Sequence, residues 1–351
     1  MHIHDFRSDT VTLPTPAMMA AIAGARLGDA ARGDDPTVNA LERLACEITG
    51  KEDALFLPSG AMANLAAVIA HECRGGEVIV EEAAHIYNAE GGGLSVLAGA
   101  LARPVRGKDG TLCPPDVEAA IRGASDPALA PTRLVCVENT HNASGGTVMP
   151  LETMEAIHHV ARRAGIPMHL DGARLFNAAA CLDVPLAALC GRADSVWFAL
   201  CKGLGGPVGA ILAGDGDFMH RARRAAKMLG GGMRQAGLIA APAIVALQDP
   251  YTTHKRDHAL ARKLAEGLAA IDASLVDAGR VQTNIVNCFA DDAGDIHRAL
   301  CERGIAVISK GRKIRFVTHA QVDEDSVDAA ISAFAEIMEE LPRGYAARNT
   351  P

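Results

Sequence analysis

Aromatic side chains and long apolar runs are both scarce in this sequence of 351 residues. It contains 1 Trp, 3 Tyr and 8 Phe, too few for the row of aromatic side chains on which single-stranded nucleic acids stack. No stretch reaches the roughly 18 uncharged apolar residues that a membrane-spanning helix needs. The opening residues, MHIHDFRSDTVTL, lack the apolar segment of a secretory signal peptide. We therefore expect neither a membrane protein nor a secreted one.

An excess of positive charge and metal-binding motifs are also missing. With 34 Lys plus Arg against 42 Asp plus Glu, the net charge is −8, which argues against a general nucleic-acid or anionic-membrane surface. The nine cysteines are odd in number and scattered without a CxxC pair, and no HExxH or Cys/His cluster occurs. These observations predict free thiols, a cytoplasmic location and no metal site.

Short apolar runs alternate with helical patterns in the first part of the chain. The runs lie at residues 53–57, 77–80, 133–138, 167–171, 195–200 and 209–213. Most of the segments between them place apolar residues at i, i+3 and i+4. Near-continuous apolar strands with helical connections predict an α/β fold, with a mostly parallel central sheet and helices on both faces.

The pattern changes after about Asp249. A long charged helix is predicted over 252–269, followed by thinner strands near 285–289 and 313–317 and a final helix over 324–341. We therefore divide the chain into two domains. Residues 1–250 form an N-terminal arm and a large α/β domain, and residues 251–351 form a small C-terminal α+β domain.

A lysine and a carboxylate each follow one of the predicted strands. Lys202 comes directly after an apolar run, inside the glycine-rich turn CKGLGG, where lost solvation makes an amine a usable nucleophile. Asp171 closes the run PMHLD, at the strand end where open α/β sheets bind ligands, and a carboxylate there can hold the ring nitrogen of pyridoxal phosphate protonated. A surface lysine and a helix-capping aspartate are the alternative interpretations. Since only one βα unit separates the two residues, they can converge on one cavity.

Three further features point to the same edge of the sheet. The segment FLPSGAMAN (56–64) is a strand, a turn and a helix start, and the free N–H groups of such a helix start can bind a phosphate. His85 and His141 each follow a predicted strand. An imidazole at this edge can stack on a cofactor ring or move a proton near neutral pH.

In order along the chain, these segments resemble the low-specificity L-threonine aldolases, a family of pyridoxal-phosphate enzymes of fold type I. The matching segments are FRSDTVTLPTPAM (6–18), GDDPTVNALERLA (33–45), FLPSGAMAN (56–64), AHIYNAEGGG (84–93), VENTHNASGGTVMPLE (137–152), HLDGARLFNA (169–178), KGLGGPVGA (202–210), KMLGGGMRQAG (227–237) and IRFVTH (314–319). The resemblance covers nearly the whole chain and implies a transferase-like fold of type I.

The resemblance also implies roles for individual residues. Lys202 would carry pyridoxal phosphate as a Schiff base, Asp171 would contact the ring nitrogen, and His85 would stack on the ring, with His85 or His141 accepting the substrate's hydroxyl proton. The residues assigned to the cofactor's phosphate side are Ser59, Gly60, Ala61 and, from a neighbouring subunit, Lys227 and Arg234. The residues assigned to the substrate are Ser8, Arg174, Arg315, Arg32 and Tyr87, with Arg174 also contacting the cofactor.

Three positions depart from the family pattern. Ala61 replaces a threonine in the phosphate site, Cys201 replaces the serine before the lysine, and Arg32 replaces a tyrosine at the neighbour's rim of the site. None of them removes a catalytic group. They bear on cofactor affinity and on side-chain preference.

The implied reaction is reversible retro-aldol cleavage of L-threonine, L-allo-threonine and related β-hydroxy-α-amino acids such as phenylserine to glycine and an aldehyde. The resemblance also implies a homo-oligomer, with the site built at a dimer interface within a tetramer. Two alternatives share the scaffold: a pyridoxal-phosphate β-eliminating C–S lyase and an aminotransferase. A non-catalytic relative is expected to have lost Lys202, which is present.

Overall fold

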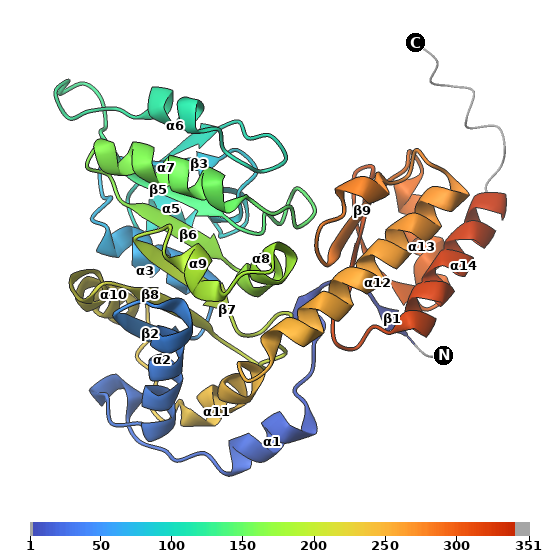
Figure 1. Ribbon diagram of the computed structural model, residues 1–351, viewed down its shortest axis with the longest axis horizontal. Coiled ribbons are helices and arrows are strands. Elements are labelled where there is room, and N and C mark those ends of the chain that lie inside the picture. The colour runs from blue at the N-terminus through green and yellow to red at the C-terminus, as the bar shows by residue number, and fades with distance from the viewer. Residues whose placement is uncertain (1–2, 341–351) are drawn as a thin grey trace. The chain divides into compact units, whose positions relative to one another are not determined.

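The computed structural model describes residues 3–340, in which the chain forms two compact units (Figure 1). One consists of the described residues of Met1–Val11 and Arg256–Pro351, and the other is Thr12–Lys255. We predicted a boundary after residue 250 and placed the N-terminal arm with the large domain. In the structure the arm's first residues belong to the small unit, because β1 (His4–Asp5) pairs in parallel with β10 (Ile305–Ala306).

A seven-stranded sheet forms the centre of the large unit. Its strand order is β2 (Asp53–Leu57), β8 (Ala210–Gly214), β7 (Ser195–Ala199), β6 (Met168–Gly172), β5 (Thr132–Glu138), β3 (Glu77–Glu81) and β4 (Leu101–Val105). The strands from β7 to β4 are parallel, and β8 runs antiparallel to both of its neighbours. The loop between β7 and β8 holds no helix, and so short a connection can only reverse the chain. The predicted mostly parallel sheet is confirmed.

Helices cover both faces of this sheet (Figure 1). Side-chain alternation along β7 explains this: Val196 and Phe198 face one apolar core, while Trp197 and Ala199 face another. The helices that contribute to the first core are α1 (Pro16–Ala23), α2 (Pro36–Thr49), α6 (Pro114–Ala120), α7 (Leu151–Arg163), α8 (Leu175–Leu182), α9 (Leu186–Cys190) and α11 (Gly237–Ala246). The second core is covered by α3 (Gly60–Ala70) and α10 (Gly216–Met228). Two short helices, α4 (His85–Asn88) and α5 (Gly93–Val96), follow β3.

The small unit is built around an antiparallel sheet. Its strand order is β11 (Ile308–Lys310), β12 (Lys313–Val317) and β9 (Ile285–Phe289). Its helices are α13 (Ala293–Glu302), α14 (Glu324–Glu340) and the part of α12 (Pro250–Ile271) that begins at Arg256. Short 3-10 helices lie at Asp9–Val11 and Ala278–Arg280 in this unit and at Ala30–Arg32 in the large unit. The predicted α+β organisation of this unit is confirmed. No helix in residues 3–340 combines the length and apolarity that crossing a bilayer requires.

The register of neighbouring strands places three side chains of the large unit in one row. Glu138 on β5 is the register partner of Asp171 on β6, and Asp171 is the partner of Trp197 on β7. Register partners on neighbouring strands point to the same face of a sheet. Three chemically distinct side chains therefore stand in one row beneath α3, near the carboxyl ends of parallel strands.

Candidate active site

Asp171 occupies the centre of this row. Its side chain is buried, and its Oδ2 accepts a hydrogen bond of 2.8 Å from Nδ2 of Asn64 on α3. Its Oδ1 accepts a bond of 3.1 Å from the backbone N–H of Ala173. The N-cap position of α8 is taken by Arg174, so Asp171 is not the cap of that helix. A buried carboxylate held by two donors presents a fixed negative charge.

Lys202 lies in the loop that connects β7 to β8, where its predicted position after a strand is confirmed. Its Nζ lies 5.9 Å from the centroid of the Trp197 ring, within the range of a cation–π contact. Its carbonyl oxygen accepts a hydrogen bond of 3.0 Å from Oγ1 of Thr12. Because Trp197 is the register partner of Asp171, the lysine amine and the carboxylate approach the same face from adjacent strands.

The start of α3 packs against the same tryptophan. Ser59 is the N-cap, and its Oγ accepts a hydrogen bond of 3.3 Å from the backbone N–H of Met62. A Cβ added to Gly60 would lie 2.2 Å from the Trp197 ring, so only glycine permits this approach. The remaining N–H groups of the first turn, including that of Ala61, form a positive helix end suited to a phosphate.

His85 begins α4 and contacts two buried carboxylates. Its Nδ1 lies 2.9 Å from Oε1 of Glu90, and its backbone N–H donates to Oε2 of Glu138 over 2.7 Å. The imidazole is 38% exposed, whereas the Glu90 side chain is 1% exposed. The hydrogen bond to Glu90 raises the pKa of His85, although partial burial opposes the shift. Part of the imidazole therefore remains accessible while its Nδ1 is held.

His141 lies deeper in the protein. Its side chain is buried, with Nδ1 2.9 Å from Oγ of Ser144 and Nε2 3.0 Å from Oε2 of Glu81. Burial opposes its protonation, but the contact with Glu81 and the charge of Glu138 outweigh burial and raise the pKa of His141. The contacts of its two ring nitrogens are thus with Ser144 and Glu81.

Three carboxylates crowd one side of this site. Burial raises the pKa of Glu138 and that of Glu90, and the negative charge of Asp171 adds to both shifts. A ligand with a protonated ring nitrogen would relieve this repulsion. The lysine amine, the helix start and the buried carboxylate row therefore fit pyridoxal phosphate, which combines an aldehyde, a phosphate and a ring nitrogen.

Sequence reasoning missed several residues that the structure places here. They are Asn64, Glu90, Glu138, His169 and Trp197. One signal was available for Asn64, because it is the only amide in the otherwise apolar helix GAMANLAAVIA. A buried amide requires partners, which would have marked Asn64 as a candidate.

The predicted substrate residues divide between the two units. In the large unit, Arg174 is buried and its Nη1 donates to Oδ1 of Asn142 over 3.0 Å, while Tyr87 on α4 is 41% exposed. In the small unit, Ser8 directly precedes the 3-10 helix Asp9–Val11, and Arg315 lies on β12 with Asn287 as its register partner. The structure thus groups Arg174 and Tyr87 with the site just described.

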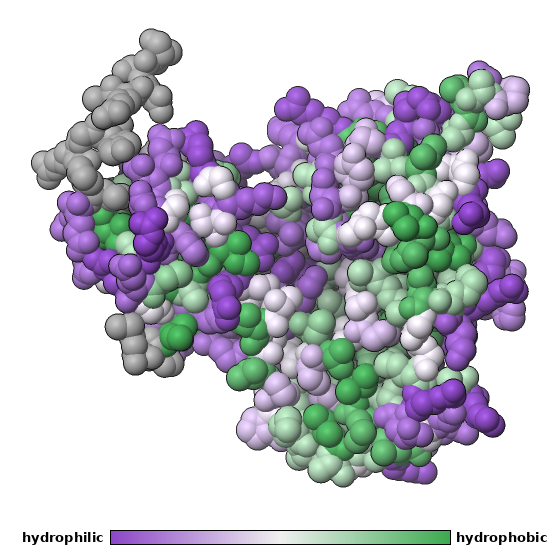
Figure 2. All heavy atoms as spheres, turned by 180° about the vertical axis from the view of Figure 1, so that it is seen from behind, coloured by the Kyte–Doolittle hydropathy of each residue, from purple (hydrophilic) through white to green (hydrophobic). Residues whose placement is uncertain are grey.

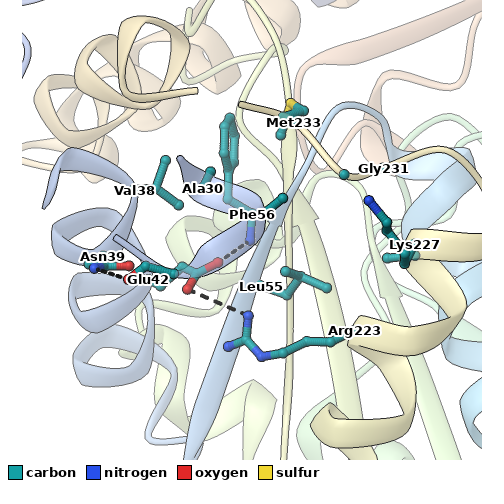
Figure 3. A pocket seen from close by; sticks show the side chains of 14 residues that line it. Ala30, Val38, Asn39, Glu42, Leu55, Phe56, Arg223, Lys227, Gly231 and Met233 are labelled. Atoms are coloured by element: carbon teal, nitrogen blue, oxygen red, sulfur yellow. Dashed lines mark hydrogen bonds and ion pairs between the residues drawn. The ribbon is translucent and has the colours of Figure 1, made fainter. Parts of the chain in front are cut away.

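Lys227 lines a different feature, a pocket of about 550 Å³ (Figure 3), and Arg32 and Arg234 each directly follow one of its lining residues, Ala31 and Met233. Lys227 on α10 lines it together with Gly231 and Gly232, and a Cβ added to Gly232 would lie 2.7 Å from Nζ of Lys227. Nη1 of Arg234 lies 3.0 Å from Oδ2 of Asp29, and Nε of Arg32 lies 3.5 Å from the same oxygen. The residues that line this pocket do not include Lys202, Asp171 or His85.

Comparisons with known proteins identify the family of this chain. The model of the beta-eliminating lyase family matches residues 5–291. Low-specificity L-threonine aldolase 1 of Arabidopsis thaliana is 42% identical over 343 residues, which cover 95% of this chain and 96% of the relative. Low specificity L-threonine aldolase of Escherichia coli (strain K12) is 41% identical over 326 residues, with coverage of 92% and 96%. The solved threonine aldolase of Leishmania major, 22% identical, has a TM-score of 0.82 and covers 95% of this chain and 99% of its own, which confirms the predicted fold.

Proposed function

Because the chain belongs to the beta-eliminating lyase family, we propose that it is a pyridoxal-phosphate-dependent L-threonine aldolase, which cleaves L-threonine to glycine and acetaldehyde. Relatives of that name, 41–42% identical over nearly the full chain, support the proposal. The structural observation that carries it is the row of register partners formed by Asp171 and Trp197, with the amine of Lys202 over the indole.

Residues of the large unit hold the cofactor in this proposal. Lys202 binds it covalently, Asp171 stabilises the positive charge on its ring nitrogen, and Ser59, Gly60 and Ala61 bind its phosphate at the start of α3. When bound, pyridoxal phosphate supplies an electron sink for the bond that breaks at Cα. His85, whose imidazole is partly exposed, would pack against the ring.

The substrate is oriented by its carboxylate and deprotonated at its hydroxyl group. A planar guanidinium binds a carboxylate in two parallel hydrogen bonds, and we assign this task to Arg174 and Arg315, with Ser8 as a further donor. His85 accepts the β-hydroxyl proton while the Cα–Cβ bond breaks, and Glu90 stabilises the imidazolium that forms. His141 is the weaker candidate for this proton because both of its ring nitrogens have partners inside the protein.

Cleavage then ends with proton return to Cα, which releases glycine. Arg32 and Tyr87 contact the side chain of the substrate in this proposal, so they affect the choice among threonine, allo-threonine and phenylserine.

We also propose that the enzyme works as a homo-oligomer, a dimer-built tetramer in which Lys227 and Arg234 of one subunit complete the phosphate side of another's site. Large apolar side chains that are at least 40% exposed support an assembly, among them Met19, Val96 and Met228. On the face drawn in Figure 2, apolar side chains form exposed patches. Nine free cysteines suit a reducing compartment, and on that ground we propose a cytoplasmic location.

The test is a product assay with L-threonine and purified, cofactor-loaded protein. The proposal expects glycine and acetaldehyde in equal amounts. 2-Oxobutyrate and ammonia as the main products, or transfer of the amino group to an added keto acid, would replace it with a β-eliminating lyase or an aminotransferase.

Variants locate the cofactor lysine in the same assay. Lys202→Ala is expected to lose both activity and the pyridoxyl group that borohydride reduction fixes on the protein. Lys108→Ala changes an exposed lysine of the same unit and is expected to retain both. A pyridoxyl group still fixed on a lysine of the site in Lys202→Ala would overturn the assignment of Lys202.

A further inference from the structure

A continuous chain of hydrogen bonds runs through the buried layer between α3 and the sheet. It begins at His71, which ends α3, where Nε2 lies 2.7 Å from Oγ of Ser195 on β7. The same hydroxyl lies 2.7 Å from Nδ1 of His169 on β6, the register partner of Ser195. Nε2 of His169 lies 3.2 Å from Oδ1 of Asn64, and Nδ2 of Asn64 donates to Asp171 over 2.8 Å. Four side chains thus connect the far end of α3 to Asp171.

The indole of Trp197 determines the donor-to-acceptor direction of these hydrogen bonds. Its Nε1 can only donate a hydrogen bond, and it lies 2.7 Å from the amide oxygen of Asn64. The amide oxygen must therefore face Trp197 and His169. Both amide hydrogens then point the other way, to Oδ2 of Asp171 and to Oε1 of Glu90.

The remaining donors follow from the orientation of Asn64. Since Oδ1 of Asn64 accepts, Nε2 of His169 carries a hydrogen. Complete burial lowers the pKa of His169 to about 3, and burial lowers the pKa of His71 to about 4. Both rings are therefore neutral near pH 7, each with one hydrogen. Nδ1 of His169 must accept from the hydroxyl of Ser195, whose oxygen in turn accepts from Nε2 of His71.

The hydrogen bonds from His71 through Ser195, His169 and Asn64 are thus all donated in the direction of Asp171, and the second amide hydrogen of Asn64 goes to Glu90. We propose that His71, Ser195, His169 and Asn64 act as positioning residues, whose aligned hydrogen bonds stabilise the negative charge of Asp171 and thereby keep the proton on the cofactor's ring nitrogen. The inference rests on the proposed function, because the ring nitrogen belongs to pyridoxal phosphate. Aligned hydrogen bonds polarise one another in a buried environment.

The surroundings of Asp171 explain why such support is needed. The charges of Glu90 and Glu138 repel that of Asp171, and repulsion between carboxylates favours a proton on one of them. If Asp171 took the proton from the ring nitrogen, the cofactor would lose the positive charge that makes it an electron sink. A chain of donors that ends on Asp171 opposes that transfer.

The first measurement needs no cofactor. Nitrogen-15 NMR of the histidine side chains in the apoprotein reports which ring nitrogen carries hydrogen, and the variants His71→Gln and His169→Gln assign the two signals. The proposal expects hydrogen on Nε2 and none on Nδ1 in both rings from pH 6 to pH 8. Hydrogen on Nδ1 of His169 would mean that these hydrogen bonds run in the opposite direction. It would overturn the proposal, whatever reaction the enzyme catalyses.

The second measurement uses pyridoxal phosphate labelled with nitrogen-15 in its ring. Ser195→Ala removes the hydroxyl and interrupts the chain far from the cofactor. The ring nitrogen signal is expected to move toward that of unprotonated pyridine, and kcat is expected to fall about tenfold with little change in KM, as for one lost hydrogen bond that supports a charge. Ser195→Thr, which keeps a hydroxyl, is expected to restore both values.

Thr132→Val is the matched control. Thr132 is a buried hydroxyl residue that begins β5 as Ser195 begins β7, and its Oγ1 accepts only from the backbone of Arg122 among the hydrogen bonds found in residues 3–340. This variant is expected to leave the ring nitrogen signal unchanged. A wild-type signal in well-folded, loaded Ser195→Ala would overturn the proposal. A wild-type protein that binds no pyridoxal phosphate would instead overturn the proposed function, and the histidine measurement would still decide the direction of the chain.

Discussion

Nδ1 of His85 and Oε1 of Glu90 lie 2.9 Å apart, and the two side chains differ sharply in exposure, at 38% and 1%. The carboxylate is therefore shielded from water on the side away from the ring, while the ring meets the site. A shielded negative charge acts on a neighbouring imidazole with little screening. Glu90 thus raises the proton affinity of His85.

Glu90→Gln is expected to lower the pKa of His85, because the hydrogen bond to the carboxylate is the largest cause of its raised value. His85 must be neutral to accept a proton, so the acid limb of the pH profile of kcat/KM is expected to move to lower pH. An NMR titration of His85 measures the shift directly. Glu82→Gln changes an exposed carboxylate on the other side of α4 and is expected to leave the pKa of His85 and the pH profile unchanged. An unshifted pKa of His85 in Glu90→Gln would contradict the role of Glu90.

Arg174→Ala and Arg315→Ala are each expected to lower kcat/KM for L-threonine by about 10² to 10⁴, as expected for the loss of a bidentate carboxylate contact in a closed site. The cofactor is expected to stay bound, which its visible absorption reports. Arg312→Ala, an exposed residue beside β12, serves as the control for Arg315. Activity within a factor of about two of wild type in either variant would place the carboxylate site elsewhere.

The shared-site proposal predicts that two inactive variants restore each other. Lys202→Ala lacks the cofactor lysine and Arg234→Ala lacks a donor to the neighbour's phosphate, so a mixed dimer would contain one intact site. Mixing the two under conditions that exchange subunits is expected to restore activity. Exchange is verified by mass spectrometry of the mixed oligomers. Confirmed exchange with activity at the parental background would mean that Arg234, which pairs with Asp29 of its own chain, serves its own subunit.

Asp257→Asn is expected to stabilise the protein at alkaline pH. The Asp257 side chain is buried, neither carboxylate oxygen has a hydrogen-bond partner among the described residues, and burial raises the pKa of Asp257 to about 7. Since the folded state binds this proton more tightly than the unfolded state, stability falls as pH rises from about 4 to about 7, by on the order of 4 kcal/mol in total.

Denaturant unfolding at pH 8 and pH 4 measures this difference. The variant is expected to gain a few kcal/mol over wild type at pH 8 and almost nothing at pH 4. Asp325→Asn, an exposed position at the start of α14, is expected to change the free energy of unfolding by no more than about 0.5 kcal/mol at either pH. Equal stability of Asp257→Asn and wild type at pH 8 would mean that Asp257 has a compensating partner.

Much of the fold was predictable because buried strands appear in the sequence as runs of apolar residues. The runs 53–57, 285–289 and 313–317 coincide with β2, β9 and β12. β4 was missed because it is a partly exposed edge strand with Pro104 near its end, and an edge strand needs neither a continuous apolar run nor every backbone donor. The reversed direction of β8 depends on the length of one loop, which apolar patterning does not report.

The candidate site was predictable only where chemistry follows directly on a strand. Lys202 and Asp171 were found because a charge after an apolar run is unusual. Asn64 and His169 were not singled out, because each matters only through the packing of α3 on the sheet, which joins residues 105 positions apart. The residue roles taken from the family resemblance remain predictions for the experiments above.

The reversed strand β8 also has a consequence that we expect for cofactor binding during synthesis. β2 pairs only with β8 in the central sheet, from Asp53 with Gly214 to Leu57 with Ala210. The start of α3 directly follows β2, so the turn that we assign to the phosphate gains the sheet pairing of β2 only after residue 214 has left the ribosome. A nascent chain that already contains Lys202 but ends before β8 therefore lacks the strand that pairs with β2, and we expect cofactor capture to be a late event in the folding of this chain.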